Sequence, residues 1–158
     1  MKTQLAFFDI DGTLSAPYYP VGPDGTLRAG MTDEQWIEFC RTWGEDSYRF
    51  CKPVLPVIRY AKELLAAGAE LYVLSTSQTE EEDRSKEKFI KRHCAGLFKS
   101  VLTVRDDAEK VQRILAMASE CDVAPEACEL VEDTYALVLD AINHGVKGTH
   151  IALIVWDL

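Results

Sequence analysis

The chain has 158 residues, of which 47% are hydrophobic and 27% are charged, and it carries a formal net charge of −9. This length and composition are typical of a globular protein with a full core, so we expect a single domain over residues 1–158. The excess of acidic side chains argues against general binding of nucleic acid or anionic membranes, because both would repel the chain over long distances.

Targeting and redox signals in the sequence are weak. The apolar stretch after Lys2 is cut short at Asp9, so we expect no signal peptide, and no segment reaches the length of a membrane span. Five cysteines, an odd number with no Cys-x-x-Cys pair, predict reduced thiols and a cytoplasmic location. The three histidines are scattered along the chain, and we therefore expect no zinc site.

The first predicted element is an apolar strand over residues 4–9, followed by an insert over residues 15–52. Residues 15–30 are rich in proline, glycine and tyrosine, which predicts a hairpin or flap. Thr32 and Gln35 form a capping-box pattern, and a short amphipathic helix with an aromatic stripe is expected after it. We interpret this stripe as core rather than as a ligand-binding surface.

Beyond the insert, short apolar strands alternate with amphipathic helices. The helix after Thr79 has a second capping-box pattern with Glu82, and its acid-then-base run up to Arg92 predicts a solvated face. The last predicted strand is almost wholly apolar, as expected for a strand that is covered on both faces. Together these segments predict an α/β fold, a doubly wound parallel five-stranded sheet with helices on both faces. The later strands are expected at residues 71–74, 98–104, 128–131 and 150–156.

The most informative segment runs from Phe7 to Leu14, where an apolar strand ends in two carboxylates and a glycine turn. In an extended chain, side chains two positions apart point the same way, so Asp9 and Asp11 can face one spot. Asp-Gly is a strong turn pair, but a turn does not explain a carboxylate already inside the apolar run at Asp9. Two carboxylates at one point repel each other unless a cation or a shared proton relieves them. The pair therefore predicts a divalent-metal site with a nucleophile and a general acid beside it.

Polar residues also stand at the ends of other predicted strands. Ser75 follows the second strand, Glu132 and Asp133 follow the fourth, and Lys110 opens the helix before the fourth strand. Because ligands bind at the carboxyl ends of parallel strands, we expect these side chains to meet the two aspartates. The rivals of Lys110 for a cationic role do not precede the fourth strand at a suitable distance; they are Lys86, Lys88 and Lys99.

This set of residues resembles the haloacid-dehalogenase-like (HAD) phosphohydrolase superfamily over nearly the whole chain. The first family motif, Asp-x-Asp-Gly-Thr, is matched by residues 9–13. The second is matched by the apolar strand ending at Ser75, the third by Lys110, and the fourth by Glu132-Asp133. One departure is that many relatives carry a further aspartate four residues after the fourth motif, where this chain has Leu137.

The resemblance implies a Mg²⁺-dependent phosphomonoester hydrolase that works through an aspartyl-phosphate. In that scheme Asp9 is the nucleophile and Asp11 the general acid and base. Ser75 and Lys110 would bind and neutralise phosphate oxygens. The residues implied as magnesium ligands are Asp9, Asp11, Asp133 and Glu132.

The insert over residues 15–52 is short, so the resemblance implies a minimal cap and a comparatively open site. We expect a phosphorylated small molecule as the partner, and we name Tyr18, Tyr19 and Arg28 as flap residues that could touch it.

Several alternatives remain open at this point. One is a polynucleotide 3′-phosphatase-like or nucleotidase activity, although the acidic charge disfavours long nucleic acid. Another is a non-enzymatic, receiver-like phosphoacceptor module, whose phosphorylated aspartate would follow the third strand, near Asp106. A dehalogenase is disfavoured by Asp11, and a phosphomutase by the short insert.

Overall fold

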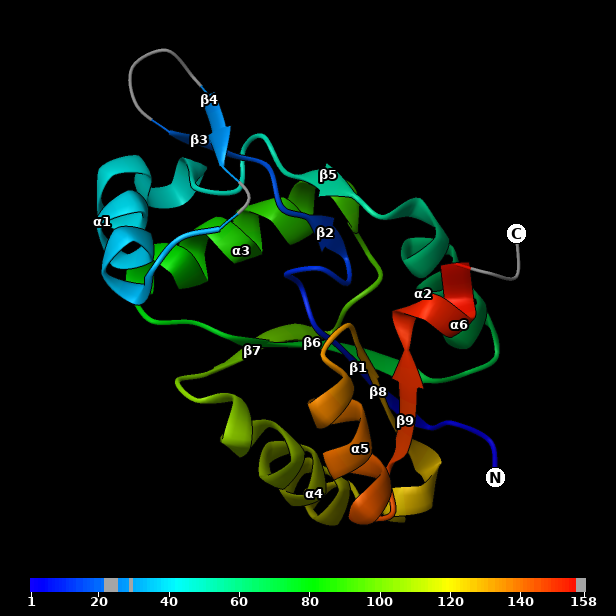
Figure 1. Cartoon of the computed structure of the whole chain (residues 1–158). Coiled ribbons are helices and arrows are strands. Elements are labelled where there is room, and N and C mark those ends of the chain that lie inside the picture. The colour runs from blue at the N-terminus through cyan, green and yellow to red at the C-terminus, as the bar shows by residue number, and fades with distance from the viewer. Residues whose placement is uncertain (22–25, 29, 156–158) are drawn as a thin grey trace.

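The chain folds around a five-stranded parallel sheet (Figure 1). The computed structural model describes residues 1–21, 26–28 and 30–155. Strand order reverses between β1 and β8, with later strands added on either side, which makes this pair the topological switch point of the sheet. In spatial order the strands are β7 (Ser100–Val104), β6 (Glu70–Thr76), β1 (Leu5–Phe8), β8 (Cys128–Glu132) and β9 (Lys147–His150).

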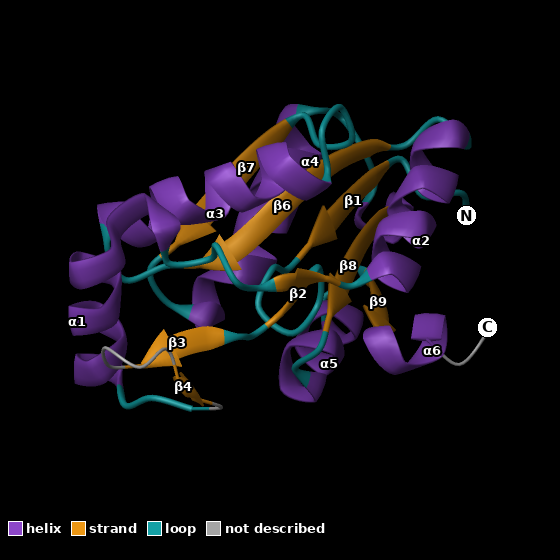
Figure 2. Cartoon of the chain, turned by 90° about the horizontal axis from the view of Figure 1, so that it is seen from above, coloured by secondary structure: helices purple, strands orange, loops and turns teal. Residues whose placement is uncertain are grey.

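Helices cover both faces of the sheet, as Figures 1 and 2 show, so the predicted doubly wound α/β fold is confirmed. One face is covered by α2 (Leu55–Ala66), α3 (Glu80–His93) and α6 (Ile151–Val155). The other face is covered by α4 (Lys110–Glu120) and α5 (Tyr135–Asn143). Short 3-10 turns, η2 (Asp107–Glu109) and η3 (Pro125–Ala127), precede α4 and β8.

The central strand explains why two hydrophobic cores form. Side chains alternate along β1, so Ala6 and Phe8 pack under α2 and α3, while Leu5 and Phe7 pack against α4 and α5. Every residue of β1 and β8 is buried, which accounts for the continuous apolar sequence of β1, while β8 also carries the buried Glu129 and Glu132. The ends of these two strands are therefore held rigidly from both sides.

The insert between β1 and α2 lies against α3 at the carboxyl end of the sheet (Figure 1). It is closed at its base by antiparallel pairing of β2 (Ser15–Ala16) with β5 (Lys52–Pro53). The predicted hairpin is present as β3 (Tyr19–Val21) paired with β4 (Thr26–Arg28). It is followed by α1 (Asp33–Trp43) and the 3-10 turn η1 (Gly44–Asp46).

The predicted capping box at the start of α1 is confirmed. The Thr32 hydroxyl accepts a hydrogen bond from the Gln35 backbone N–H at 3.2 Å, and the Gln35 side chain accepts one from the Thr32 N–H at 3.0 Å. The box predicted for α3 is half formed. Thr79 accepts from the Glu82 N–H at 3.1 Å, whereas the Glu82 carboxylate accepts from Gln78 instead.

The predicted strand over residues 150–156 is wrong. β9 spans Lys147–His150, and Ile151–Val155 forms the helix α6, while residue 156 lies outside the described residues. A short apolar run has no clear period. Ile151 and Ile154 are partly buried against the core under α2, while Leu153 is exposed, as expected for a helix that packs on one side only.

The prediction of a solvated face for α3 is wrong at two positions. Glu82 is 3% exposed and Lys86 is fully buried. These residues lie on the inner face of the helix, together with Phe89 and Ile90. Burial of opposite charges is tolerated here because each finds polar partners around the site described below.

All five cysteines are free thiols; Cys121 is exposed and the others are buried. Among the described residues, no helix combines the length and the apolar character needed to cross a membrane.

Candidate active site

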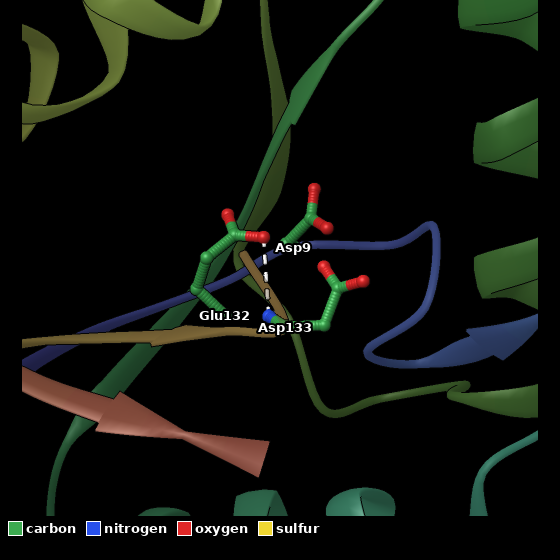
Figure 3. A group of neighbouring side chains, drawn as sticks. All are labelled: Asp9, Glu132 and Asp133. Carbon is green, nitrogen blue, oxygen red and sulfur yellow. Dashed lines mark hydrogen bonds between the residues drawn. The ribbon is translucent and has the colours of Figure 1, made fainter. Parts of the chain in front are cut away.

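Three acidic residues converge at the switch point, where β1 and β8 end side by side (Figure 3). Asp9 follows β1 directly, and its backbone N–H donates to the Val131 carbonyl at 3.1 Å. Glu132 is the last residue of β8, and Asp133 follows it. The predicted meeting of the first and fourth motifs at one edge of the sheet is thus present in the fold.

Lys110 joins two of these carboxylates. Its ammonium lies 2.9 Å from Asp9 Oδ1 and 2.9 Å from Glu132 Oε2. All three side chains are almost wholly buried, so the two carboxylates and the lysine stabilise each other in a poorly solvated place. Lys110 is held there because it is the first residue of α4, as the sequence predicted.

Burial shapes the ionisation of this cluster. It raises the pKa of Asp9 to about 7, although the Lys110 ammonium opposes the shift. Burial alone would lower the pKa of Lys110, but the carboxylates of Asp9 and Glu132 outweigh it and raise that pKa above its ordinary value. Burial also raises the pKa values of Glu132 and Asp133. The lysine is therefore a permanent positive charge, and the carboxylates are short of cationic partners.

The oxygens available to a cation can be assigned from their hydrogen bonds. Asp9, Glu132 and Asp133 offer carboxylate oxygens that all lie within 4.8 Å of one another. Both Glu132 oxygens are already occupied, one by Lys110 and the other by the backbone N–H groups of Asp133 and Thr134 at 3.2 and 3.3 Å. Thr13 is only a distant donor to Asp9 Oδ2 and Asp133 Oδ1, at 3.5 Å each. A hard, oxygen-only set of this kind fits Mg²⁺ or a similar divalent cation, with Asp9 and Asp133 as the freest ligands.

Gly12 provides the space in which the Asp133 carboxylate sits. A Cβ atom at Gly12 would lie 2.1 Å from Asp133 Oδ2, and the glycine has a φ of +80°. The glycine of the first motif therefore serves both the turn and the close approach of the fourth-motif carboxylate.

We expect Gly12→Ala to destabilise the fold more than Gly96→Ala, a matched control. Gly96 has nearly the same φ, +79°, but nothing lies within 4 Å of its Cβ position. The control should lose about 1–2 kcal/mol of unfolding free energy through backbone strain alone. Gly12→Ala should lose more and should also weaken Mg²⁺ binding, because Asp133 must move. Urea unfolding and magnesium titration measure both, and equal losses in the two variants would contradict the close approach.

Asp11 lies on the other side of the site with its own lysine. Its Oδ1 accepts hydrogen bonds from the hydroxyls of Tyr19 and Tyr48 at 2.8 and 2.7 Å, and Lys86 Nζ lies 3.3 Å from its Oδ2. The tyrosines come from the insert and the lysine from α3. The two motif aspartates are thus each paired with one buried lysine, and Asp11 is oriented by the insert.

Ser75 lies near the site, but its hydroxyl is bonded to Lys86 and it is not among the described residues that line the cavity around Asp9. Its hydroxyl accepts a hydrogen bond from Lys86 Nζ at 2.7 Å, and the same ammonium donates to the Thr76 carbonyl at 2.6 Å. β6 ends two residues beyond the predicted end at residue 74, at Thr76, whose hydroxyl donates to Asp107. Thr76 rather than Ser75 lines the cavity around Asp9. The phosphate-binding role of Ser75 stays a prediction, with Thr76 as a competitor.

The cavity at the switch point has a volume of about 160 Å³ and is lined by both motif aspartates, Lys110 and the Glu132-Asp133 pair. Leu137, which stands where many relatives have an aspartate, also lines it. Asp140 is turned to the surface of α5 and lies 3.3 Å from His144, so it does not replace the missing carboxylate. Asp107 lines the cavity as well and lies 4.0 Å from Lys110.

The sequence assigns no role to several site residues, among them Thr13, Tyr48 and Lys86. Thr13 belongs to the first motif, and Lys86 carried a signal, since it is spaced four residues from Glu82 and four from Ile90 on the inner face of α3. Tyr48 carried no such signal, because only the folding of the insert brings it to Asp11. Of the predicted flap contacts, Tyr19 reaches Asp11, Tyr18 is 42% exposed, and the side chain of Arg28 lies outside the described part of the structure.

The raised pKa of Asp9 gives a prediction for the metal-free protein. A folded pKa of about 7, above the ordinary value of 3.8, means that the folded state binds the proton more tightly. Protonation of Asp9 therefore stabilises the folded state at low pH, and this stabilisation is lost as the pH rises from about 4 to about 7. In EDTA, wild type should lose on the order of 2–4 kcal/mol more unfolding free energy over this range than Asp9→Asn. Urea melts across the range measure this, and parallel curves for the two proteins would contradict it.

The doubly wound fold is similar to that of solved haloacid dehalogenase-like hydrolases. The structure is similar to that of a protein from Lactobacillus delbrueckii subsp. bulgaricus assigned as a phosphoglycolate phosphatase, with a TM-score of 0.63 and 15% identity over 93% of this chain and 85% of that one. It is also similar to a protein from Clostridium difficile assigned as a phosphatase, with a TM-score of 0.65 and 16% identity over 92% and 83% of the two chains.

A third similar structure is the N-terminal part of a Bacteroides fragilis protein, which contains a phosphatase domain in complex with Mg. Its TM-score is 0.53 and its identity 14%, over 92% of this chain and 35% of that one. No protein-family model and no curated protein sequence matches the chain. At these identities the likeness establishes the fold.

Proposed function

We propose that the protein is a Mg²⁺-dependent phosphomonoester hydrolase that works through an aspartyl-phosphate on Asp9. The observation that carries this proposal is the cluster at the switch point, where a buried Asp9 is held by Lys110 beside the carboxylates of Glu132 and Asp133. Such a cluster supplies a fixed nucleophile, a fixed positive charge and a cation site within one small cavity.

In the first step, Asp9 Oδ2 attacks the phosphorus, since Oδ1 is held by Lys110 at 2.9 Å. The bond from phosphorus to the alcohol oxygen breaks, and Asp11 gives its proton to that oxygen. In the second step Asp11 takes a proton from water, and the water oxygen attacks the phosphorus. Inorganic phosphate leaves, and the Asp9 carboxylate is restored.

The chain's other site residues hold these groups in place. Lys110 favours the charged form of Asp9 and orients it, and Tyr19 and Tyr48 fix Asp11 through its Oδ1. A Mg²⁺ ion held by Asp9, Asp133 and the Asp11 backbone carbonyl would neutralise charge on the phosphoryl oxygens. The Mg named for the Bacteroides fragilis phosphatase domain supports this choice of cation.

We further propose that the chain is a single hydrolase domain in which residues 15–52 act as a minimal cap, and that it works in the cytoplasm on a phosphorylated small molecule. The net charge of −9 disfavours the polynucleotide 3′-phosphatase-like alternative. The receiver-like alternative gains no support from Asp106, whose carboxylate accepts a hydrogen bond from the Ala108 N–H at 2.8 Å as the cap of η2.

Removal of the metal tests the proposal. We expect hydrolysis of p-nitrophenyl phosphate in the presence of Mg²⁺, a loss of at least about 100-fold with EDTA, and recovery when Mg²⁺ is added back. Release of p-nitrophenolate, followed by absorbance, measures all three. Equal rates with Mg²⁺ and with EDTA would contradict the metal-dependent scheme, and no hydrolysis of any phosphomonoester would contradict the proposed function.

A further inference from the structure

A second cavity of about 350 Å³ adjoins the site on the side of the insert. The two cavities share Asp11 and Thr76 as lining residues. One wall of the larger cavity comes from the carboxyl edge of the sheet and from α3, and the other from the hairpin and the start of α1. Asp11 therefore stands on the border between a small, strongly polar cavity and a larger one.

This border position is where a general acid has to lie. The acid must reach the oxygen that joins phosphorus to the alcohol, so the two parts of the substrate fall on either side of it. The inference rests on the proposed function, which puts the phosphoryl group beside Asp9 in the smaller cavity. The alcohol then occupies the larger one, whose volume is in the range of small-molecule pockets.

Two aromatic rings form a fixed wall of the larger cavity. The rings of Tyr19 and Trp36 pack edge to face, with centroids 4.9 Å apart at an angle of 69°. The Trp36 indole N–H donates to the Glu82 carboxylate, and the Tyr19 hydroxyl donates to Asp11 at 2.8 Å. Because both polar tips are already bonded, the ring faces and edges are what the cavity offers to a ligand.

The charged side chains that line the larger cavity, among the described residues, are all acidic. Asp11, Asp33 and Glu82 line the cavity, and no lysine or arginine is among its described lining residues. Lys86 lies beneath it, 3.3 Å from Asp11 and 3.9 Å from Glu82, and offsets one of these charges. The remaining excess of negative charge, together with aromatic rings, favours a cation and repels an anion.

We propose that the larger cavity selects phosphomonoesters whose alcohol carries a positively charged amine next to an aromatic or apolar portion, and no second anionic group. Asp33 and the Trp36 ring hold the amine, and the alcohol oxygen lies at Asp11. Alcohols that carry a carboxylate, such as glycolate, are disfavoured by the same charges.

Three aryl phosphates that share one ring test this inference. They are O-phosphotyramine, p-ethylphenyl phosphate and 3-(4-phosphonooxyphenyl)propanoate, which carry an amine, no charge and a carboxylate at the same place. We expect kcat/KM to fall in that order, by at least about 10-fold from the amine to the carboxylate, mainly through KM. Equal kcat/KM values, or preference for the carboxylate, overturn the inference and leave the proposed function standing. Hydrolysis of p-nitrophenyl phosphate but of none of these three esters also overturns the inference and leaves the proposed function standing, whereas hydrolysis of none of the four overturns both.

A matched pair of variants tests whether the Asp33 carboxylate sets the preference for the amine over the carboxylate ester. Asp33→Asn should reduce the amine-to-carboxylate ratio by about two- to fivefold, because it removes a negative charge that lines the cavity. Glu34→Gln changes a neighbouring exposed acid that is not among the described lining residues and should leave the ratio as in wild type. An unchanged ratio in Asp33→Asn, or the same change in both variants, would overturn the assignment of Asp33.

Discussion

Replacement of Asp9 by asparagine is expected to abolish phosphomonoester hydrolysis, with kcat lowered by at least about 10⁴-fold. Asparagine has nearly the shape of aspartate but cannot form the acyl phosphate, and the Lys110–Glu132 pair at 2.9 Å remains to hold the site together. Steady-state kinetics with p-nitrophenyl phosphate in saturating Mg²⁺ measure the loss.

The control for this variant is Asp140→Asn, which changes an aspartate on the surface of α5 next to His144. It should keep wild-type kcat, and both variants should remain folded by circular dichroism. Substantial activity in folded Asp9→Asn would contradict the role of Asp9 as the phosphoryl acceptor.

Lys110→Met should be the most destabilising single change at the site. The Lys110 ammonium lies 2.9 Å from a carboxylate oxygen of Asp9 and 2.9 Å from one of Glu132, so the substitution leaves both buried carboxylates without their shared cation. Loss of one partner from a buried ion pair costs about 3–5 kcal/mol, and the loss should be smaller near pH 5, where buried acids with raised pKa values can bind protons. Urea unfolding at about pH 7.5 and about pH 5 measures both effects.

Two further variants separate charge from packing. Lys110→Met combined with Glu132→Gln should recover part of the lost stability but no activity, because the double variant removes one uncompensated charge and still lacks the lysine. Lys99→Met changes a lysine with 62% of its side chain exposed and should cost less than about 1 kcal/mol. A loss in Lys110→Met as small as that of Lys99→Met would contradict the buried cluster.

Much of the site could be predicted from the sequence because its residues stand at strand ends. Asp9, Glu132 and Asp133 each follow or end an apolar strand, and parallel strands bring their carboxyl ends to one edge. Lys110 was predictable for the same reason, since it opens the helix that leads into β8. The doubly wound fold followed from the alternation of strands and helices along the chain.

What could not be predicted depends on contacts between distant segments. Tyr48 reaches Asp11 only because the insert packs on α3. The sequence around Lys86 is typical of a solvated, charged helix, whereas in the structure Lys86 is buried next to Asp11. The hydroxyl that lines the cavity belongs to Thr76 rather than to Ser75, because β6 continues to Thr76. Neighbouring side chains in a strand point to opposite faces, so a difference of one residue changes which hydroxyl faces the cavity. Residues 151–155 form a helix where the sequence predicts a strand, because a short apolar run does not distinguish strand from helix.

The most direct test of the central claim is chemical trapping of the acyl phosphate. The protein is quenched in acid during turnover of p-nitrophenyl phosphate with Mg²⁺ and reduced with borohydride, which converts an aspartyl-phosphate to homoserine, and the modified residue is located by peptide mass spectrometry. We expect homoserine at position 9 in wild type and its absence when Mg²⁺ or substrate is omitted. Homoserine at another aspartate, such as Asp106, or an unmodified Asp9 during active turnover, would contradict the account.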